Sequence, residues 1–223
     1  MPSFSPNSGS DRKPKDPYRP RYHFSAEKSW MNDPNGLVYY GGEYHLFYQY
    51  YPDDVVWGPM HWGHAVSRDL VRWEHLPVAL YPDELGMIFS GSAVIDYRNT
   101  AGFGREAMVA IFTHHNPDTL VQSQSLAYSL DCGRSWRKYG GNPVVRPLPG
   151  IVDFRDPKVF WYDKGDGGGH WVMCLAAGTA VDFYMSPNLI DWEMCGRFGG
   201  GYGSVVGVWE TPEFFKVQMK NSF

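Results

Sequence analysis

The sequence predicts an all-β fold of the propeller type, in which similar blades follow one another along the chain. Short β-prone runs recur between turn clusters, and no window shows the i, i+3, i+4, i+7 apolar spacing of an amphipathic helix. Two short motifs also repeat in phase, at intervals of roughly 60 residues, and a period of that length is typical of one blade per repeat.

The β-prone runs begin after a polar, Pro-rich lead, residues 1–21, which we expect to be disordered. From Tyr22 onward each run is short and bounded by turn residues, as strands are. The predicted strands are Leu37–Tyr40, Glu43–Tyr50, His61–Ser67, Ser92–Tyr97, Met108–Thr113, Val121–Ser129, Lys158–Tyr162, His170–Ala176 and Val181–Ser186.

The first repeated motif is Ser-x-Asp/Asn followed, after three or four residues, by Trp. It occurs at 67–73, 129–136 and 186–192, and its tryptophans Trp73, Trp136 and Trp192 lie 63 and 56 residues apart. A polar turn followed by a packed Trp once per blade explains this spacing better than coincidence among nine tryptophans.

The second motif places a polar residue before a β run, at Asp33, Ser90, Asp156 and Glu210. We expect these positions to begin the innermost strands of successive blades, and innermost strands converge on the central channel. The predicted blades are residues 30–80, 86–140 and 152–197, with a further strand near 208–217. Since four blades are the usual minimum, residues 22–223 are expected to be an incomplete propeller domain.

Asp33 lies in the most distinctive of these stretches, Trp30–Leu37 (WMNDPNGL). Pro34 lacks an N–H group, so Asp33 is not expected in the middle of a regular strand ladder. From this stretch alone, an Asx-turn before a hairpin and a functional carboxylate at the mouth of a strand are both open.

Composition excludes several functions. The net charge is −4 and the pI is near 6.0, with no basic stripe, so the sequence gives no support for nucleic-acid binding. No apolar run is long enough for a transmembrane helix, so no membrane partner is expected. The lead lacks the apolar region of a signal peptide, which predicts a cytoplasmic chain as written, or an extracellular one whose signal has been removed. Aromatic residues make up 17%, and aromatic rings favour strands and stack on sugars.

Five stretches together resemble, in the right order, the signature blocks of glycoside hydrolase family 32, which contains invertases, inulinases and levanases. The stretches are WMNDPNG (30–36), WGPMHWGH (57–64), FSGS (89–92), FRDP (154–157) and WE (209–210). The resemblance implies a five-bladed β-propeller followed by a β-sandwich, of which this chain would hold about three blades and the first strand of the fourth. Where the family usually has Glu-Cys-Pro-Asp, this chain has ETPE (210–213).

The resemblance also implies chemistry: hydrolysis of β-fructofuranosidic bonds in sucrose or short fructans, with retention of configuration and without a cofactor. By resemblance Asp33 is the nucleophile, and Glu210 is the acid/base, which needs burial beside Trp209 and a nearby like charge to hold a proton. Asp156 would accept hydrogen bonds from fructose hydroxyls. The implied substrate-binding residues are Asn32, Gln49, Trp57, Ser90 and Arg155.

No metal site is expected. His61 and His64 are three residues apart in a predicted strand, where they would face opposite sides, so a packing role is favoured. His114 and His115 lie near the expected site without an assigned role.

Three alternatives remain open at this stage. The chain could be a fructosyltransferase with the same first half-reaction, an inactive truncated relative, or a lectin-like propeller. A lectin-like propeller would not need three carboxylates at the positions where the blades begin.

Overall fold

The computed structural model describes residues 17–20 and 22–217, and within these the chain forms twelve strands and no helix. The first blade holds β1 (Trp30–Tyr40), β2 (Glu43–Tyr51), β3 (His61–Ser67) and β4 (Glu74–Leu80). The second holds β5 (Met87–Asp96), β6 (Ala107–His115), β7 (Gln122–Ser129) and β8 (Arg137–Lys138). The third holds β9 (Phe154–Asp163), β10 (Gly169–Ala177), β11 (Ala180–Ser186) and β12 (Glu193–Gly199).

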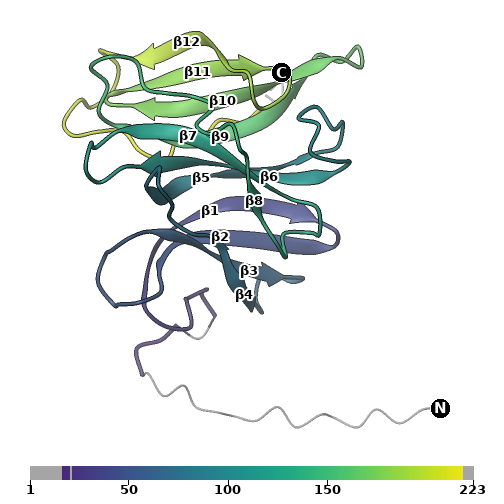
Figure 1. Ribbon diagram of the computed structural model, residues 1–223, viewed down its shortest axis with the longest axis vertical. Helices are drawn as coiled ribbons and strands as arrows, with labels where there is room; N and C mark the ends of the chain where they lie inside the picture. The colour runs from purple at the N-terminus through teal and green to yellow at the C-terminus, as the bar shows by residue number, and fades with distance from the viewer. Residues whose placement is uncertain (1–16, 21, 218–223) are drawn as a thin grey trace, which may run out of the picture.

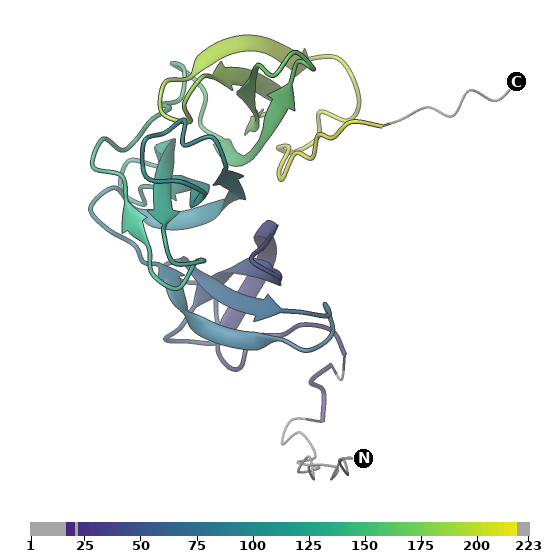
Figure 2. The same cartoon turned by 90° about the vertical axis from the view of Figure 1, so that its right-hand side faces the viewer.

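Each blade is an antiparallel meander in which consecutive strands pair in order. The blades stack on one another in Figure 1 and follow an arc in Figure 2. Contacts from blade to blade are densest between β1 and β5 and between β5 and β9, the first strands of the three sheets. These strands are therefore the innermost ones, and the all-β propeller prediction and the three blade ranges are confirmed.

The repeated Ser-Asx turn joins the third strand of each blade to the fourth. Ser67 Oγ accepts the N–H of Leu70 at 2.8 Å, and Ser129 Oγ accepts the N–H of Gly133 at 2.8 Å. In the third blade Ser186 Oγ accepts the N–H of Asn188 at 3.1 Å. Short hydroxyl and carboxylate side chains that satisfy nearby backbone N–H groups are the physical basis of the repeat seen in the sequence.

Two hydrophobic layers hold the blades together. Phe47 and Trp62 of the first blade pack against Ile88 and Phe112 of the second, and all four side chains are fully buried. A second layer joins the second blade to the third and includes Ile111, Leu126, Phe154, Met173 and Leu175. Burying large apolar side chains between sheets is the main stabilising contribution in such a stack.

Some expectations were wrong or lie outside the described residues. Residues 208–217 form no strand, because no neighbouring strand in the described chain pairs with them, and the backbone there is extended but irregular. The outer strands β4, β8 and β12 were not predicted. The expected disordered lead lies outside the described residues except for 17–20. In the part of the chain that the structure describes, no helix is long and apolar enough to span a membrane.

Candidate active site

The three innermost strands each carry a β-bulge at a residue that the sequence singled out. In β1 the register shifts between Met31 and Pro34, so that Asp33 lies in the bulge. In β5 the shift leaves Ser90 unpaired, and in β9 it falls at Asp156. A bulge turns its side chain out of the ordinary strand alternation, and bulges are frequent beside active sites.

Local sequence explains these bulges. Pro34 and Pro157 have no N–H to give to a ladder, which favours an interruption directly after each aspartate. After Ser90 the backbone of β5 comes so close to β6 that a Cβ on Gly91 would lie 2.0 Å from the carbonyl oxygen of Ile111. Only glycine fits that position, and its close approach lets Ser90 project inward.

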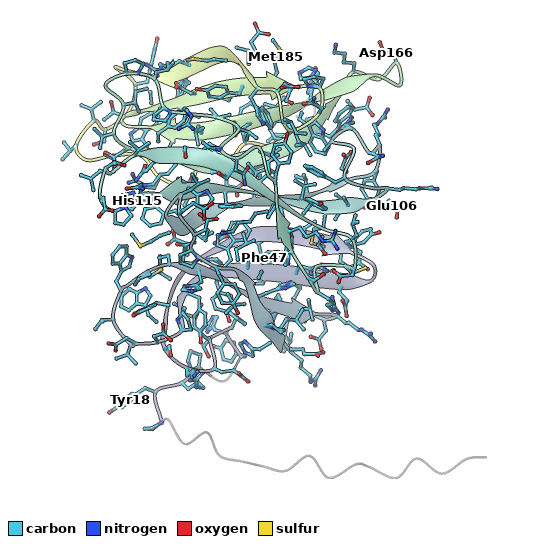
Figure 3. All side chains as sticks on the ribbon, viewed as in Figure 1. Tyr18, Phe47, Glu106, His115, Asp166 and Met185 are labelled. Carbon is cyan, nitrogen blue, oxygen red and sulfur yellow. The ribbon has the colours of Figure 1, made fainter. Side chains whose placement is uncertain are left out.

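The bulged residues meet in one solvent-open pocket of about 190 Å³ at the end of the inner strands. The pocket is lined by Asn32, Asp33, Gln49, Trp57, Phe89, Ser90, Arg155, Asp156 and Glu210. All eight site residues predicted from the sequence are therefore brought together, although they come from three blades and a later segment. His115, which stacks on Phe89 at 4.6 Å, marks this end of the middle blade in Figure 3, and Glu106 marks the opposite end.

Asp33 is half-buried and oriented by two hydrogen-bond donors. Ser90 Oγ donates to its Oδ2 at 3.0 Å, and Asn32 Nδ2 donates to its Oδ1 at 3.2 Å. The amide of Asn32 is itself held by the indole N–H of Trp30 at 2.8 Å. This chain of contacts fixes the carboxylate while leaving it facing the pocket.

Asp156 is held in an uncommon backbone conformation, with φ at +62°, and is 7% exposed. Its own N–H donates to Thr113 Oγ1 at 3.1 Å, and its Oδ2 accepts the N–H of Thr211 at 3.0 Å. Burial raises the pKa of Asp156 to about 6, and the charges of Asp33 and Glu210 act in the same direction. The Thr211 N–H and the Arg155 guanidinium oppose this rise in pKa only partly.

Arg155 connects the carboxylates of the site. Its guanidinium donates to Glu210 Oε1 at 2.9 Å and to Asp153 Oδ1, and its Nε lies 4.0 Å from Asp156 Oδ2. Only 11% of the Arg155 side chain is exposed. A mostly buried guanidinium among three acids orients them and balances their charge.

Glu210 differs from the expectation in its surroundings. Its side chain is 61% exposed, and the indole N–H of the neighbouring Trp209 donates to the carbonyl of Ser204. The expected burial beside Trp209 is therefore wrong. Glu210 is held in the pocket by Arg155, not by packing.

Two further walls of the pocket suit a sugar. Gln49 is 2% exposed, and its amide nitrogen has no hydrogen-bond partner, so a buried donor is available to a ligand. Trp57 is 51% exposed at the rim of the pocket, and its ring makes a T-shaped contact with Phe89. Sequence reasoning missed Phe89, although it precedes Ser90 in one of the quoted blocks.

The histidines pack as expected. His61 is buried and its Nδ1 lies 2.8 Å from the carbonyl of Pro59, while His64 Nε2 lies 3.0 Å from His45 Nδ1. Within residues 17–20 and 22–217, no group of three or more His, Cys, Asp or Glu side chains is arranged to hold a metal ion.

Comparison with known proteins identifies relatives of this pocket-bearing chain. Residues 23–222 match the N-terminal domain of the glycosyl hydrolases family 32. A levanase of Bacillus subtilis is 58% identical over 218 residues, which cover 96% of this chain and 31% of that protein. An extracellular exo-inulinase of Aspergillus niger is 45% identical over 230 residues, covering 91% of this chain and 42% of the relative.

Solved structures agree with the fold. The exo-inulinase of Aspergillus awamori superposes with a TM-score of 0.81 at 43% identity, over 88% of this chain and 42% of that one. The beta-fructofuranosidase of Schwanniomyces occidentalis, complexed with fructosyl-erythritol, superposes with a TM-score of 0.81 at 39% identity. The match covers 92% of this chain and 40% of that one. The chain thus spans about a third to two-fifths of the length of these relatives.

Proposed function

Because the chain belongs to glycosyl hydrolase family 32, we propose that it hydrolyses β-fructofuranosidic bonds, in sucrose or short fructans, with retention of configuration. The observation that carries this proposal is the single pocket in which Asp33, Asp156 and Glu210 meet beside Arg155. The relatives named as levanase, exo-inulinase and beta-fructofuranosidase support the substrate class.

Asp33 is proposed as the nucleophile. Its carboxylate oxygen attacks the anomeric carbon of the fructosyl unit, and the bond from that carbon to the leaving oxygen breaks. The hydrogen bonds from Ser90 and Asn32 support this role, since they fix the direction of attack before substrate binds.

Glu210 is proposed as the acid/base. In the first step its carboxyl gives a proton to the leaving oxygen, and in the second it takes a proton from the water that attacks the fructosyl–Asp33 ester. The side chain is exposed in the free protein, so a bound sugar can reach it and would cover it. For retention, the Asp33 and Glu210 carboxyls are expected about 5–5.5 Å apart.

Asp156, Gln49 and Trp57 are proposed to hold the fructosyl unit. Asp156 accepts hydrogen bonds from its hydroxyls and stabilises the positive charge that develops in the transition state. The unpartnered Gln49 amide donates to a hydroxyl, and the exposed Trp57 ring packs on the apolar face of the sugar. These contacts require no cofactor.

The test is hydrolysis of sucrose by the intact protein, followed as release of glucose and fructose, with Asp33→Ala as the control. We expect glucose and fructose in equal amounts from the wild type and no turnover from the variant. Glucose release without free fructose would favour the transferase alternative. Full activity of Asp33→Ala would overturn the assignment.

A further inference from the structure

The start of β9, which carries Arg155 and Asp156, is held by side chains of the second blade. β9 lies at the end of its sheet, beside β10, and β6 and β7 of the second blade contact it from the other side (Figure 1). Three buried polar residues there bond to β9: Thr113 of β6, and Gln122 and Gln124 of β7, each at most 5% exposed. We call these three residues the inter-blade clamp. The chemistry proposed above gives them no role.

We propose that the clamp is a positioning device for catalysis, in which Thr113 and Gln124 hold the backbone of Asp156 in its positive-φ conformation and so aim its carboxylate into the catalytic pocket. Neither residue lines that pocket, so both act through Asp156 and not on the substrate. This inference rests on the proposed function, because it concerns the carboxylate that is proposed to stabilise the transition state.

The hydrogen bonds of the clamp form a chain with one direction. Gln124 Nε2 donates to the carbonyl of Phe154 at 2.8 Å, and because a carbonyl only accepts, the amide oxygen of Gln124 faces the other way. That oxygen accepts the hydroxyl of Thr113 at 2.7 Å. The hydroxyl proton is thereby committed, which leaves a lone pair of Thr113 Oγ1 for the N–H of Asp156 at 3.1 Å. Each link sets the orientation of the next.

Asp156 needs a partner of this kind outside its own sheet. The bulge in β9 interrupts the pairing with β10 between Cys174 and Ala176, and the following Pro157 has no N–H to donate. With φ at +62°, Asp156 has a conformation that a residue other than glycine keeps only when its surroundings impose it. Its N–H is buried, so without the Thr113 hydroxyl it would be an unpaired donor. The hydroxyl therefore favours the backbone conformation that turns this carboxylate toward the pocket.

Gln122 fixes the other end of the same stretch. Its Oε1 accepts the N–H of Phe154 at 2.7 Å and lies 3.4 Å from Nη1 of Arg155. Both polar groups of the Phe154 backbone are thus bonded to glutamine side chains of the second blade, and the Phe154 ring is fully buried. Residues 154–156 are held at both ends, so the bulge between them has little freedom to move.

The experiment measures kcat and KM for sucrose in the intact protein and in two variants of Thr113. Thr113→Val keeps the shape of the side chain without its hydroxyl, and Thr113→Ser keeps the hydroxyl. We expect kcat of Thr113→Val to fall on the order of tenfold or more, with KM within about threefold of wild type, because the displaced group acts mainly in the transition state. Thr113→Ser should keep kcat within about threefold of wild type.

The matched control is Ser92→Ala. Ser92 Oγ, in β5 of the same blade, accepts the N–H of Val159 at 2.9 Å, which is another buried hydrogen bond between the second and third blades. Its loss should lower the free energy of unfolding, measured in urea, and leave kcat within about twofold of wild type. Unfolding curves of all the variants identify conditions in which each is fully folded, so that kcat is compared between folded proteins.

Gln124→Met tests whether the clamp acts as a chain. Methionine has a similar length and donates no hydrogen bond to Phe154. Because Thr113 and Gln124 act through the same N–H, the double variant Thr113→Val/Gln124→Met should have a kcat within about threefold of the slower single variant. Losses that multiply in the double variant would show two independent effects and overturn the chain.

An unchanged kcat in Thr113→Val, no rescue by Thr113→Ser, or an equal fall in Ser92→Ala would overturn the inference and leave the proposed function standing. Failure of the wild type to release fructose from sucrose or a short fructan would overturn the proposed function and this inference with it.

Discussion

Replacing Asp156 by Asn should stabilise the fold at neutral pH while removing activity. The buried carboxyl has its pKa raised from 3.8 to about 6, so ionising it costs the folded state about 3 kcal/mol at pH 8. Asn is nearly the same shape and tolerates the positive φ of this position. Its side-chain oxygen can still accept the N–H of Thr211.

The sign follows from linkage. A carboxyl whose pKa is higher in the folded state lowers stability as the pH rises from about 4 through about 6. The amide that replaces the carboxyl in Asp156→Asn does not ionise in this pH range. Its free energy of unfolding, relative to wild type, should therefore rise by about 2–3 kcal/mol between pH 4 and pH 8 and level off above pH 7.

The assay is urea unfolding at pH 4, 5, 6, 7 and 8, together with sucrose hydrolysis. The control is Asp131→Asn. Burial opposes the charge of Asp131, but hydrogen bonds from Ser135 and Ser129 outweigh it and lower its pKa to about 2, so that variant should be less stable than wild type by an amount that stays nearly constant from pH 5 to pH 8. Activity of Asp156→Asn should fall by about 10²–10³-fold, as when a preorganised electrostatic partner is removed. A pH-independent difference in stability between wild type and Asp156→Asn would refute the reasoning.

Three further changes have defined outcomes. Arg155→Ala removes the positive charge that lowers the pKa of Asp156, so kcat/KM should fall at least about 100-fold. The acidic limb of the pH–rate profile should also move to higher pH, and an unmoved limb would contradict this prediction. Gly36→Ala should lower the free energy of unfolding in urea by about 1–3 kcal/mol, because φ is +59° and the new Cβ would lie 2.7 Å from the ring of Phe47. The control Gly42→Ala, also at positive φ but in open space, should lower it by less. Equal losses of stability in the two variants would contradict a clash with Phe47. Burial lowers the pKa of His64 to about 3, so the free energy of unfolding should decline as the pH falls below about 6.5. His64→Asn should make that decline less steep. An unchanged dependence on pH in the variant would show that other groups cause the decline.

The sequence predicts much of the fold because its repeats have direct physical causes. Ser67, Ser129 and Ser186 each satisfy backbone N–H groups of the same turn, so the motif recurs wherever that turn is needed. Pro34 and Pro157 interrupt their strands directly after the site aspartates, so the same residues that mark the blade starts also create the bulges.

What the sequence does not predict depends on tertiary contacts. The outer strand β12 is largely exposed and β4 is mostly half-buried, neither carries an alternating apolar pattern, and β8 has only two residues. Glu210 lies in a segment that forms no paired strand, so its position is fixed by the ion pair with Arg155, which spans 55 residues of sequence. Long-range polar contacts of this kind leave no local periodicity to read.

The central claim is that Asp33 forms a covalent fructosyl intermediate, and peptide mass mapping tests it directly. Glu210→Gln should be mixed with a fructoside whose leaving group needs no acid, such as fructosyl fluoride, quenched in acid and digested. Without the base for the second step, the peptide that contains Asp33 should carry one added fructosyl unit. An unmodified Asp33 peptide under turnover, or an adduct on the peptide that contains Asp156, would contradict the account.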